Sequence, residues 1–417
     1  MTAFLRTRRL SRTLKTRADV EAWQAERITA WLRETVAAAP FYRGRRIEKL
    51  DDLPVVDKSV LMAAFEKFNR AGVTREEGWR AVESGRPPKG YSVGASTGTS
   101  GNRGLFVISH AERYEWLGVI VAKLLPGFPL EKARIALILP LNTALYGAVN
   151  RTGRLRLRFF DLRRGVATLT PEVVAFRPDT IIAPPTVLRW LAEHDRSLRP
   201  KRLFSSAEVL DPIDRDIVEA RYDIRLREIY MATEGLLATS CAHGTLHLAE
   251  DVVHFELEPV PESDLVSPIV SDFTRETQAM ARYRMNDLLR LKNDACLCGS
   301  PLRAVAEVVG RSDDIFVLSR AGGEGSIPVT PDVLRNAILN ADRRIADFRL
   351  AQTGRRTLSL TLPKDLLAET VEAACAALSN LLRNMGAEAR IAAVQQDLPP
   401  PTVKLRRVER RWRAEET

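Results

Sequence analysis

The sequence of 417 residues is poor in cysteine and lacks long apolar runs. Its four cysteines are too few for the disulfide framework of a secreted protein, so we expect a reducing, cytoplasmic setting. No stretch approaches the roughly 18 consecutive apolar residues that a membrane-spanning helix needs, which excludes a helical membrane protein. No segment recurs at a fixed period, which excludes a repeat array.

Positive charge exceeds negative charge by ten at pH 7, and nearly all of the excess lies at the two ends. Residues 1–18 contain basic side chains and no acidic ones, and residues 404–417 are also strongly basic. A nucleic-acid-binding protein usually spreads such charge over a docking face with aromatic side chains among the charges. We therefore expect solvated basic termini and no nucleic-acid partner. The first residues also resemble an Arg- and Ser-rich transit peptide, which remains an alternative.

Short apolar segments alternate with amphipathic ones up to about residue 235, a pattern typical of an α/β domain with a largely parallel sheet. Residues 134–140, 179–185, 202–206 and 227–232 predict strands; residues 18–39, 57–68, 111–125, 186–194 and 211–222 predict helices. From Thr245 to about Val309, closely spaced extended segments predict a β-rich subdomain.

After Gly310 the pattern changes to that of a smaller α+β unit, with helices at 330–340 and 366–386 and a hairpin at 348–362. The fold class we predict is α/β, with a large N-terminal domain over residues 1–310 and a small, mobile C-terminal domain over residues 311–417. The last residues, rich in proline and arginine, are expected to be mobile.

The most informative segment is STGTSGNRG, from Ser96 to Gly104. Alternating hydroxyl groups and glycines suit a loop whose backbone N–H groups and side chains surround an anion. The segment is not a Walker A loop, because no Lys-Ser or Lys-Thr follows its glycines. We refer to residues 96–104 as the phosphate loop.

Four further motifs follow in order: YMATEG (Tyr230–Gly235), YRMNDLL (Tyr283–Leu288), GRSDD (Gly310–Asp314) and PTVKLRR (Pro401–Arg407). With the phosphate loop, this ordered set resembles the core signatures of the adenylate-forming superfamily, which contains the acyl-CoA synthetases. The flanking segments TRETQAMARYRMNDLL and CLCG are similar to the branch of phenylacetate–CoA ligases and of enzymes that adenylylate a deazaflavin coenzyme. The resemblance covers residues 40 to 407, approximately.

The resemblance implies an ATP- and Mg²⁺-dependent ligase and assigns roles to particular residues. Thr233 would contact the α-phosphate, Glu234 would bind Mg²⁺, and Lys404 would be the mobile catalytic lysine. The small domain would rotate about Asp313. The remaining nucleotide-binding residues are Ser96, Thr97, Gly98, Thr99, Ser100 and Gly101 for the β- and γ-phosphates, Ser206, Ala207, Glu208 and Tyr230 for adenine, and Asp287 with Arg311 for the ribose.

The sequence departs from the family pattern at three places. The phosphate loop ends in Asn102-Arg103-Gly104, without the usual Lys or Pro, and Val403 replaces the glycine that usually precedes the lysine. The segment SRAGGEGSIPV, after GRSDD, differs from the wording that helps to build the CoA tunnel in relatives. Plain alternatives therefore stay open: Lys404 as one more residue of a basic tail, and Glu234 as a solvated turn residue.

A separate group of metal-binding residue types lies in the β-rich part. Three of the four cysteines, Cys241, Cys296 and Cys298, fall near His243 and His247. Three thiolates and one imidazole form a closed, structural zinc site, although inert buried thiols are the alternative. The segment GTLH is similar to relatives, which favours His247 over His243 as the fourth ligand.

These observations predict an enzyme that activates a carboxylic acid as an acyl-adenylate, releases pyrophosphate and transfers the acyl group to CoA or a carrier thiol. One alternative is transfer to an amine or hydroxyl, or adenylylation of a coenzyme. A more distant alternative is a zinc-stabilised nucleic-acid-binding protein. A small or aryl acid would suit a compact pocket lined by Tyr146, Pro184 and Pro185. The sequence does not specify the oligomeric state.

Overall fold

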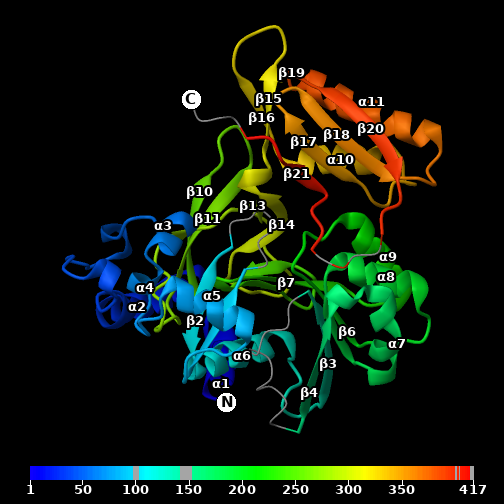
Figure 1. Cartoon of the computed structure of the whole chain (residues 1–417). Helices are drawn as coiled ribbons and strands as arrows, with labels where there is room; N and C mark the ends of the chain where they lie inside the picture. Colours follow the sequence, from blue (N-terminus) through cyan, green and yellow to red (C-terminus); the bar gives the residue numbers. More distant parts are fainter. Residues whose placement is uncertain (97–102, 141–152, 400–401, 403, 414–417) are drawn as a thin grey trace. The chain divides into compact units, whose positions relative to one another are not determined.

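The computed structural model describes residues 1–96, 103–140, 153–399, 402 and 404–413 (Figure 1). The chain forms two compact units. Unit 1 comprises Met1–Met285, Leu289–Glu307 and Thr402–Lys404, and unit 2 comprises Asn286–Leu288, Val308–Pro401 and Leu405–Thr417. Within the described ranges, no helix combines the length and the apolar character that a bilayer span requires.

Nine α-helices are described in unit 1 and two in unit 2. Those of unit 1 are α1 (Thr2–Thr13), α2 (Arg17–Trp31), α3 (Lys58–Ala63), α4 (Phe65–Phe68), α5 (Arg75–Ser84), α6 (His110–Leu124), α7 (Val166–Phe176), α8 (Pro185–His194) and α9 (Pro212–Tyr222). Those of unit 2 are α10 (Pro331–Ala341) and α11 (Ala368–Asn384). Side-chain caps fix several starts: Asp57 accepts the Val60 N–H at 2.9 Å, as the sequence predicts for an N-cap.

The expectation of a solvated N-terminus is wrong for residues 2–13, which form α1. Its apolar positions Ala3, Phe4 and Leu10 recur at helical spacing and are buried. The helix packs on α6, where a Cβ added at Gly118 would lie 3.0 Å from the Ala3 Cβ. The basic side chains thus occupy the outer face of a docked amphipathic helix.

One sheet of twelve strands lies mainly in unit 1, and two of its strands each have one end in unit 2. Its order is β10 (Val253–Pro259), β11 (Leu265–Asp272), β13 (Asp287–Lys292), β14 (Ala304–Arg311), β9 (Leu246–Leu248), β8 (Gly235–Ser240), β7 (Leu226–Ala232), β6 (Arg202–Ser206), β5 (Thr180–Ala183), β3 (Ala133–Leu139) and β4 (Leu155–Asp161), with β12 (Tyr283–Arg284) beside β11. Strands β3 to β7 pair in parallel, and β7 to β9 pair antiparallel. The predicted parallel sheet and β-rich region are therefore both present, but as parts of one continuous sheet.

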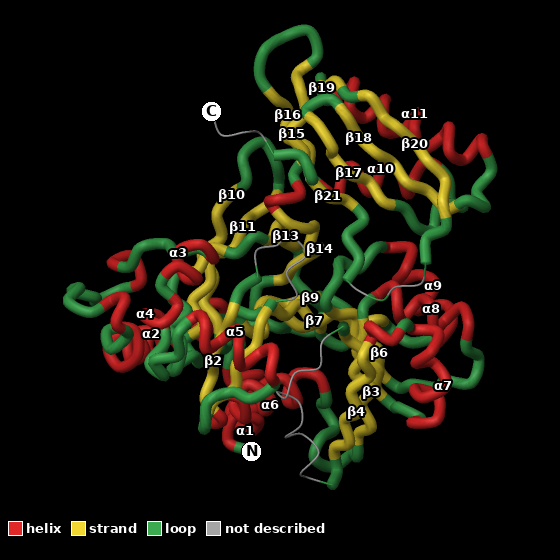
Figure 2. The backbone as a smooth tube through the Cα atoms, viewed as in Figure 1, coloured by secondary structure: helices red, strands yellow, loops and turns green. Residues whose placement is uncertain are grey.

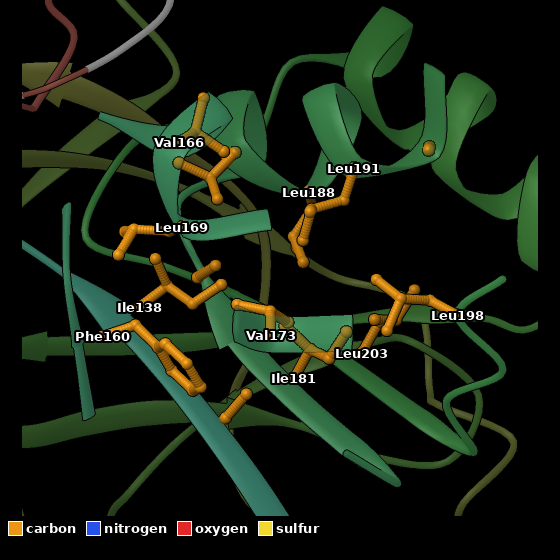
Figure 3. Close-up of a cluster of buried hydrophobic side chains, with 14 of the residues drawn as sticks. Ile138, Phe160, Val166, Leu169, Val173, Ile181, Leu188, Leu191, Leu198 and Leu203 are labelled. Carbon is orange, nitrogen blue, oxygen red and sulfur yellow. The ribbon is translucent and has the colours of Figure 1, made fainter. Parts of the chain in front are cut away.

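Helices α7, α8 and α9 cover one face of the parallel strands (Figure 1). The core between helices and strands includes Phe160, Leu169, Leu188 and Leu203, each nearly or fully inaccessible to solvent (Figure 3). Continuous apolar strands of this kind are typical of a parallel sheet with helices on its face. This packing fixes the carboxyl ends of β5, β6 and β7 side by side.

Unit 2 contains two smaller sheets. One has the order β16 (Ser326–Val329), β15 (Phe316–Arg320), β19 (Ala387–Glu388), and the other β20 (Arg390–Gln396), β18 (Thr357–Pro363), β17 (Arg349–Gly354), β21 (Val408–Arg410). Helices α10 and α11 pack on one face of the four-stranded sheet (Figure 2). Because β21 pairs with β17, residues 408–410 are not the mobile end that the sequence predicts.

A hairpin, β1 (Tyr91–Ala95) paired with β2 (Leu105–Ser109), carries the phosphate loop. This confirms the strand–loop–strand arrangement around the loop. Several described elements were not predicted, among them α1, α5, β4 and α7.

Candidate functional site

The base of the phosphate loop is closed by hydrogen bonds between Ser96 and Gly104. The Ser96 N–H donates to the Gly104 carbonyl at 2.8 Å, and the Gly104 N–H donates to the Ser96 hydroxyl at 2.7 Å. Ser96 therefore shapes the loop, and its hydroxyl proton is left to donate to a ligand. The other predicted phosphate-binding residues, Thr97, Gly98, Thr99, Ser100 and Gly101, lie outside the described residues.

Two basic side chains lie at the closing end of this loop. The guanidinium of Arg103 stacks over the ring of Trp79, 4.8 Å from its centroid, and its Nε donates to the Ser96 carbonyl. The methylene stem of Lys58, at the start of α3, lies beside Gly104. The sequence alone gave no reason to place Lys58 here, because its neighbours predict only a helix start.

Thr233 and Glu234 form the two-residue turn between β7 and β8, which we call the catalytic turn after the role that the sequence predicts for it. The Thr233 hydroxyl donates to the Glu234 carboxylate at 2.8 Å. Glu234 is only 7% exposed, so the alternative of a solvated turn residue is wrong. Behind the turn, burial raises the pKa of Asp272, while the nearby guanidinium of Arg275 opposes this shift.

The residues predicted around adenine lie at the carboxyl ends of neighbouring parallel strands. Ser206 ends β6 and is buried, and Ala207 follows it with a positive φ of 74°. Glu208 accepts a hydrogen bond from Thr186 at 3.0 Å, and Tyr230 lies on β7. Ligands of open α/β sheets bind at this edge. Ser206, Tyr230 and the catalytic turn thus share one side of unit 1.

Of the residues predicted to line the acid pocket, Pro184 follows β5 at the same edge and Pro185 begins α8. Tyr146 lies outside the described residues.

The predicted ribose and hinge residues belong to unit 2. Asp287 begins β13 and Arg311 ends β14. Asn286, directly before β13, is bonded to the hinge residue Asp313. Its side-chain amide donates to the Asp313 carboxylate at 2.5 Å, and its side-chain oxygen accepts the Asp313 N–H at 3.2 Å. Asp313 is exposed and lies within a single 3₁₀ turn, Ser312–Asp314.

Lys404 is the last residue of unit 1 before the chain re-enters unit 2. It is half-buried, and its neighbour Val403 lies outside the described residues. Two residues later, Arg406 forms an ion pair with Asp314 of unit 2. Burial raises the pKa of the Asp314 carboxyl, and Arg406 counteracts this shift.

Three thiols and one imidazole converge in unit 1, which we call the cysteine–histidine cluster: Cys241, His247, Cys296 and Cys298. Their donor atoms all lie within 4.8 Å of one another. His243 is exposed and is not part of this group. The cluster therefore contains the four residues that the sequence singled out, with His247 as the imidazole.

Two spacings within the cluster are close to the edges of a tetrahedron around zinc. With Zn–S bonds of about 2.3 Å, two sulfur ligands lie about 3.8 Å apart. The Cys241 and Cys296 sulfurs are 3.7 Å apart, and the Cys298 sulfur is 3.3 Å from His247 Nε2. His247 Nδ1 bonds to the Leu302 carbonyl at 3.0 Å, which leaves Nε2 facing the thiols.

The thiols of the cluster differ in acidity: burial raises the pKa of the Cys298 thiol to about 12, which disfavours its thiolate. Burial opposes ionisation of Cys296, but hydrogen bonds from Thr245, the Cys298 backbone and His247 lower its pKa to about 6. The guanidinium of Arg227 stacks on Phe204 on the adjoining strands and interacts with Cys241. A positive charge there would offset the net negative charge of a zinc ion held by three thiolates.

No family model matches the chain. Two phenylacetate–coenzyme A ligases are similar to it in sequence. The one from Thermus thermophilus is 24% identical over 338 residues, or 72% of each chain. The one from Pseudomonas putida is 25% identical over 247 residues, covering 54% of this chain and 55% of that relative.

In three dimensions the chain is similar to a 2-hydroxyisobutyryl–coenzyme A ligase in complex with its acyl-AMP. The TM-score is 0.70 at 18% identity, with 94% of this chain and 90% of that chain covered. The chain therefore shares the fold of this acyl-adenylate-forming ligase. The sequence similarity to phenylacetate–coenzyme A ligases, together with this shared fold, confirms the predicted resemblance and fold class.

Proposed function

We propose that the protein activates a small or aryl carboxylic acid with ATP, forming an acyl-adenylate and pyrophosphate, and then transfers the acyl group to CoA. The observation that carries this proposal is the buried catalytic turn at the carboxyl edge of the parallel strands, on the same side as Ser206 and Tyr230. The similarity of the chain to phenylacetate–coenzyme A ligases favours this enzymatic function over the nucleic-acid-binding alternative.

The residues of the proposed mechanism would bind the triphosphate and stabilise its negative charge during the reaction. The phosphate loop would hold the β- and γ-phosphates, and the Thr233 hydroxyl would turn away from the Glu234 carboxylate to donate its proton to the α-phosphate. The Glu234 carboxylate, buried beside that hydroxyl, would hold the Mg²⁺ ion, which neutralises phosphate charge when bound. Lys404 would donate to the α-phosphate and the substrate carboxylate together.

Asp287 and Arg311 would bind the ribose hydroxyls. The small domain, proposed over residues 311–417, would rotate about Asp313 so that the adenylate becomes accessible to CoA. Transfer to a carrier thiol, an amine or a hydroxyl remains the alternative for the second step, because the segment after GRSDD departs from the CoA-ligase pattern.

The proposal includes a structural zinc ion at the cysteine–histidine cluster. Four protein ligands close the tetrahedron, so the ion would have a structural role and no catalytic one.

The test is a panel of carboxylic acids incubated with the purified protein, ATP and Mg²⁺, with pyrophosphate release as readout. Acids that respond are then given CoA, and the thioester is identified by mass. Glu234→Gln keeps the size of the side chain and removes its charge, and should reduce pyrophosphate release by about 10–100-fold. Pyrophosphate release without a thioester would support the alternative acceptors, and no release with any acid would contradict the proposal.

A further inference from the structure

Residues 272–278, which we call the strap, leave β11 and are anchored to three separate elements of unit 1. Glu112 of α6 accepts hydrogen bonds from the backbone of Glu276 at 2.8 Å and of Thr277 at 2.9 Å. The Gln278 side chain accepts the Val107 N–H of β2 at 2.9 Å. These bonds hold the strap against the hairpin that carries the phosphate loop.

The centre of the strap reaches the catalytic turn through Arg275. Its Nη2 donates to the Thr233 carbonyl at 2.6 Å. Asp272, which is also buried, lies beside its Nε at 3.7 Å. Trp31 of α2 donates to the Arg275 carbonyl at 2.7 Å, so the backbone of this residue is fixed as well.

The same guanidinium also contacts the phosphate-loop hairpin. Its central carbon lies 5.6 Å from the centroid of the Phe106 ring on β2. Phe106 pairs with Gly94 of β1, and its ring occupies the space that a Gly94 side chain would take. Arg275 therefore touches both parts of the site that meet the triphosphate, the catalytic turn and the hairpin.

Folding alone does not complete the hydrogen bonds of Arg275. The side chain is only 9% exposed, yet its Nη1 has no partner among the described residues. A buried donor without a partner destabilises the fold. A charged side chain placed at such a cost between two halves of a site points to a role in that site.

We propose that Arg275 is a positioning residue for adenylate formation, which sets the Thr233 hydroxyl and the Glu234 carboxylate at a fixed distance from the phosphate loop. The proposal rests on the proposed function, because these two groups are its contacts to the α-phosphate and to Mg²⁺. Without the Nη2 hydrogen bond, the Thr233 carbonyl loses its donor and the two-residue turn gains freedom.

The test uses Arg275→Met, which keeps the apolar stem, and Arg275→Lys, which keeps a charge and a donor. The matched control is Arg134→Met. Arg134 also donates to a backbone carbonyl, that of Phe176, and its guanidinium stacks on the Phe176 ring, 4.9 Å from the centroid. Unlike Arg275, it lies at the start of β3, at the end of that strand opposite the carboxyl edge.

Each variant is assayed for adenylate formation over a range of Mg²⁺ concentrations, and for thioester formation from a chemically prepared acyl-adenylate. Arg275→Met should lower kcat of adenylate formation about 10–100-fold and raise the Mg²⁺ concentration needed, while thioester formation stays near the parent rate. Arg275→Lys should recover most of the loss, and Arg134→Met should lower thermal stability without changing the Mg²⁺ dependence.

Equal losses in both half-reactions, or the same Mg²⁺ shift in Arg134→Met, would overturn the positioning role. A parent protein that forms no adenylate from any acid would contradict the proposed function. In that case the affinity for MgATP, measured for the parent and for Arg275→Met, still tests the positioning role. Equal affinities in the two proteins would overturn it.

Discussion

Gly235, directly after the catalytic turn, offers a sharp test of how closely this region is packed. It begins β8 with a φ of 145°, a conformation that side chains rarely adopt, and an added Cβ would lie 2.8 Å from Asp272 Oδ2. The Asp272 carboxylate cannot move away freely, because its Oδ1 accepts the Thr274 N–H at 2.9 Å and the Thr274 hydroxyl at 2.6 Å. Gly235→Ala therefore introduces two penalties.

Backbone strain at a positive φ costs about 1–3 kcal/mol. Forcing a methyl group into a filled site costs about 1–3 kcal/mol more. We expect Gly235→Ala to lower the free energy of unfolding by about 2–6 kcal/mol in total. Gly44→Ala is the control for strain alone, because Gly44 has a φ of 81° and no atom within 4 Å of an added Cβ.

The assay is denaturant unfolding of Gly235→Ala in the parent and in an Asp272→Ala background. Asp272→Ala removes the atoms that clash, so the penalty of Gly235→Ala should fall there by about 1–3 kcal/mol, the overlap part. An equal penalty in the two backgrounds, or a penalty no larger than that of Gly44→Ala, would refute the reasoning.

Four further outcomes can be measured. Asp287→Ala should weaken ATP binding by about 1–3 kcal/mol, since it removes the acceptor proposed for the ribose hydroxyls; unchanged affinity by calorimetry would show that the nucleotide site is misplaced. Cys296→Ser should release zinc and lower Tm, and purified parent without stoichiometric zinc would disprove the metal site. Asp313→Pro should impair one half-reaction far more than the other, whereas Lys404→Ala should impair adenylate formation and largely spare transfer; parallel losses for Asp313→Pro would argue against domain rotation. Burial holds the pKa of His254 below its usual 6.5, so the unfolded state binds a proton that the folded state resists. The contribution of His254 to the free energy of unfolding is therefore complete above pH 6.5 and decreases as the pH falls below this value. When Tm is measured over a series of pH values, it should fall less steeply at acid pH in His254→Gln than in the parent.

Sequence patterns predicted most of the elements that form the carboxyl edge of the parallel strands, because buried parallel strands and the helices on them carry strong apolar periodicity. They missed β4 and α7 for a physical reason. β4 is an edge strand whose exposed positions hold Arg156 and Arg158, charges that mask the strand pattern and protect the edge. α7 contains Pro171, which normally indicates a helix end.

The site shows a similar division. Motif order predicted a role for the turn of Thr233 and Glu234, and the grouping of three cysteines beside two histidines predicted the cysteine–histidine cluster, because these residues lie in short segments of the sequence. Lys58 and Arg275 were not assigned any role, because each reaches the site only through contacts with residues distant in the sequence. The basic N-terminus was misread because charge was counted without the helical spacing of Phe4 and Leu10, which buries one face of α1.

The ion pair between Arg17 of α2 and the fully buried Glu250 has a consequence for protein synthesis. The two residues are 233 positions apart, and Glu250 also binds Arg303. At about 5–20 residues per second, the ribosome needs about 10–50 s after making Arg17 to produce its partner. During this interval α2 emerges without the surface on which it docks. A chaperone or a tag fused to the N-terminus can therefore contact this helix before the rest of the protein does. Docking of the helix becomes a late event in the maturation of the chain.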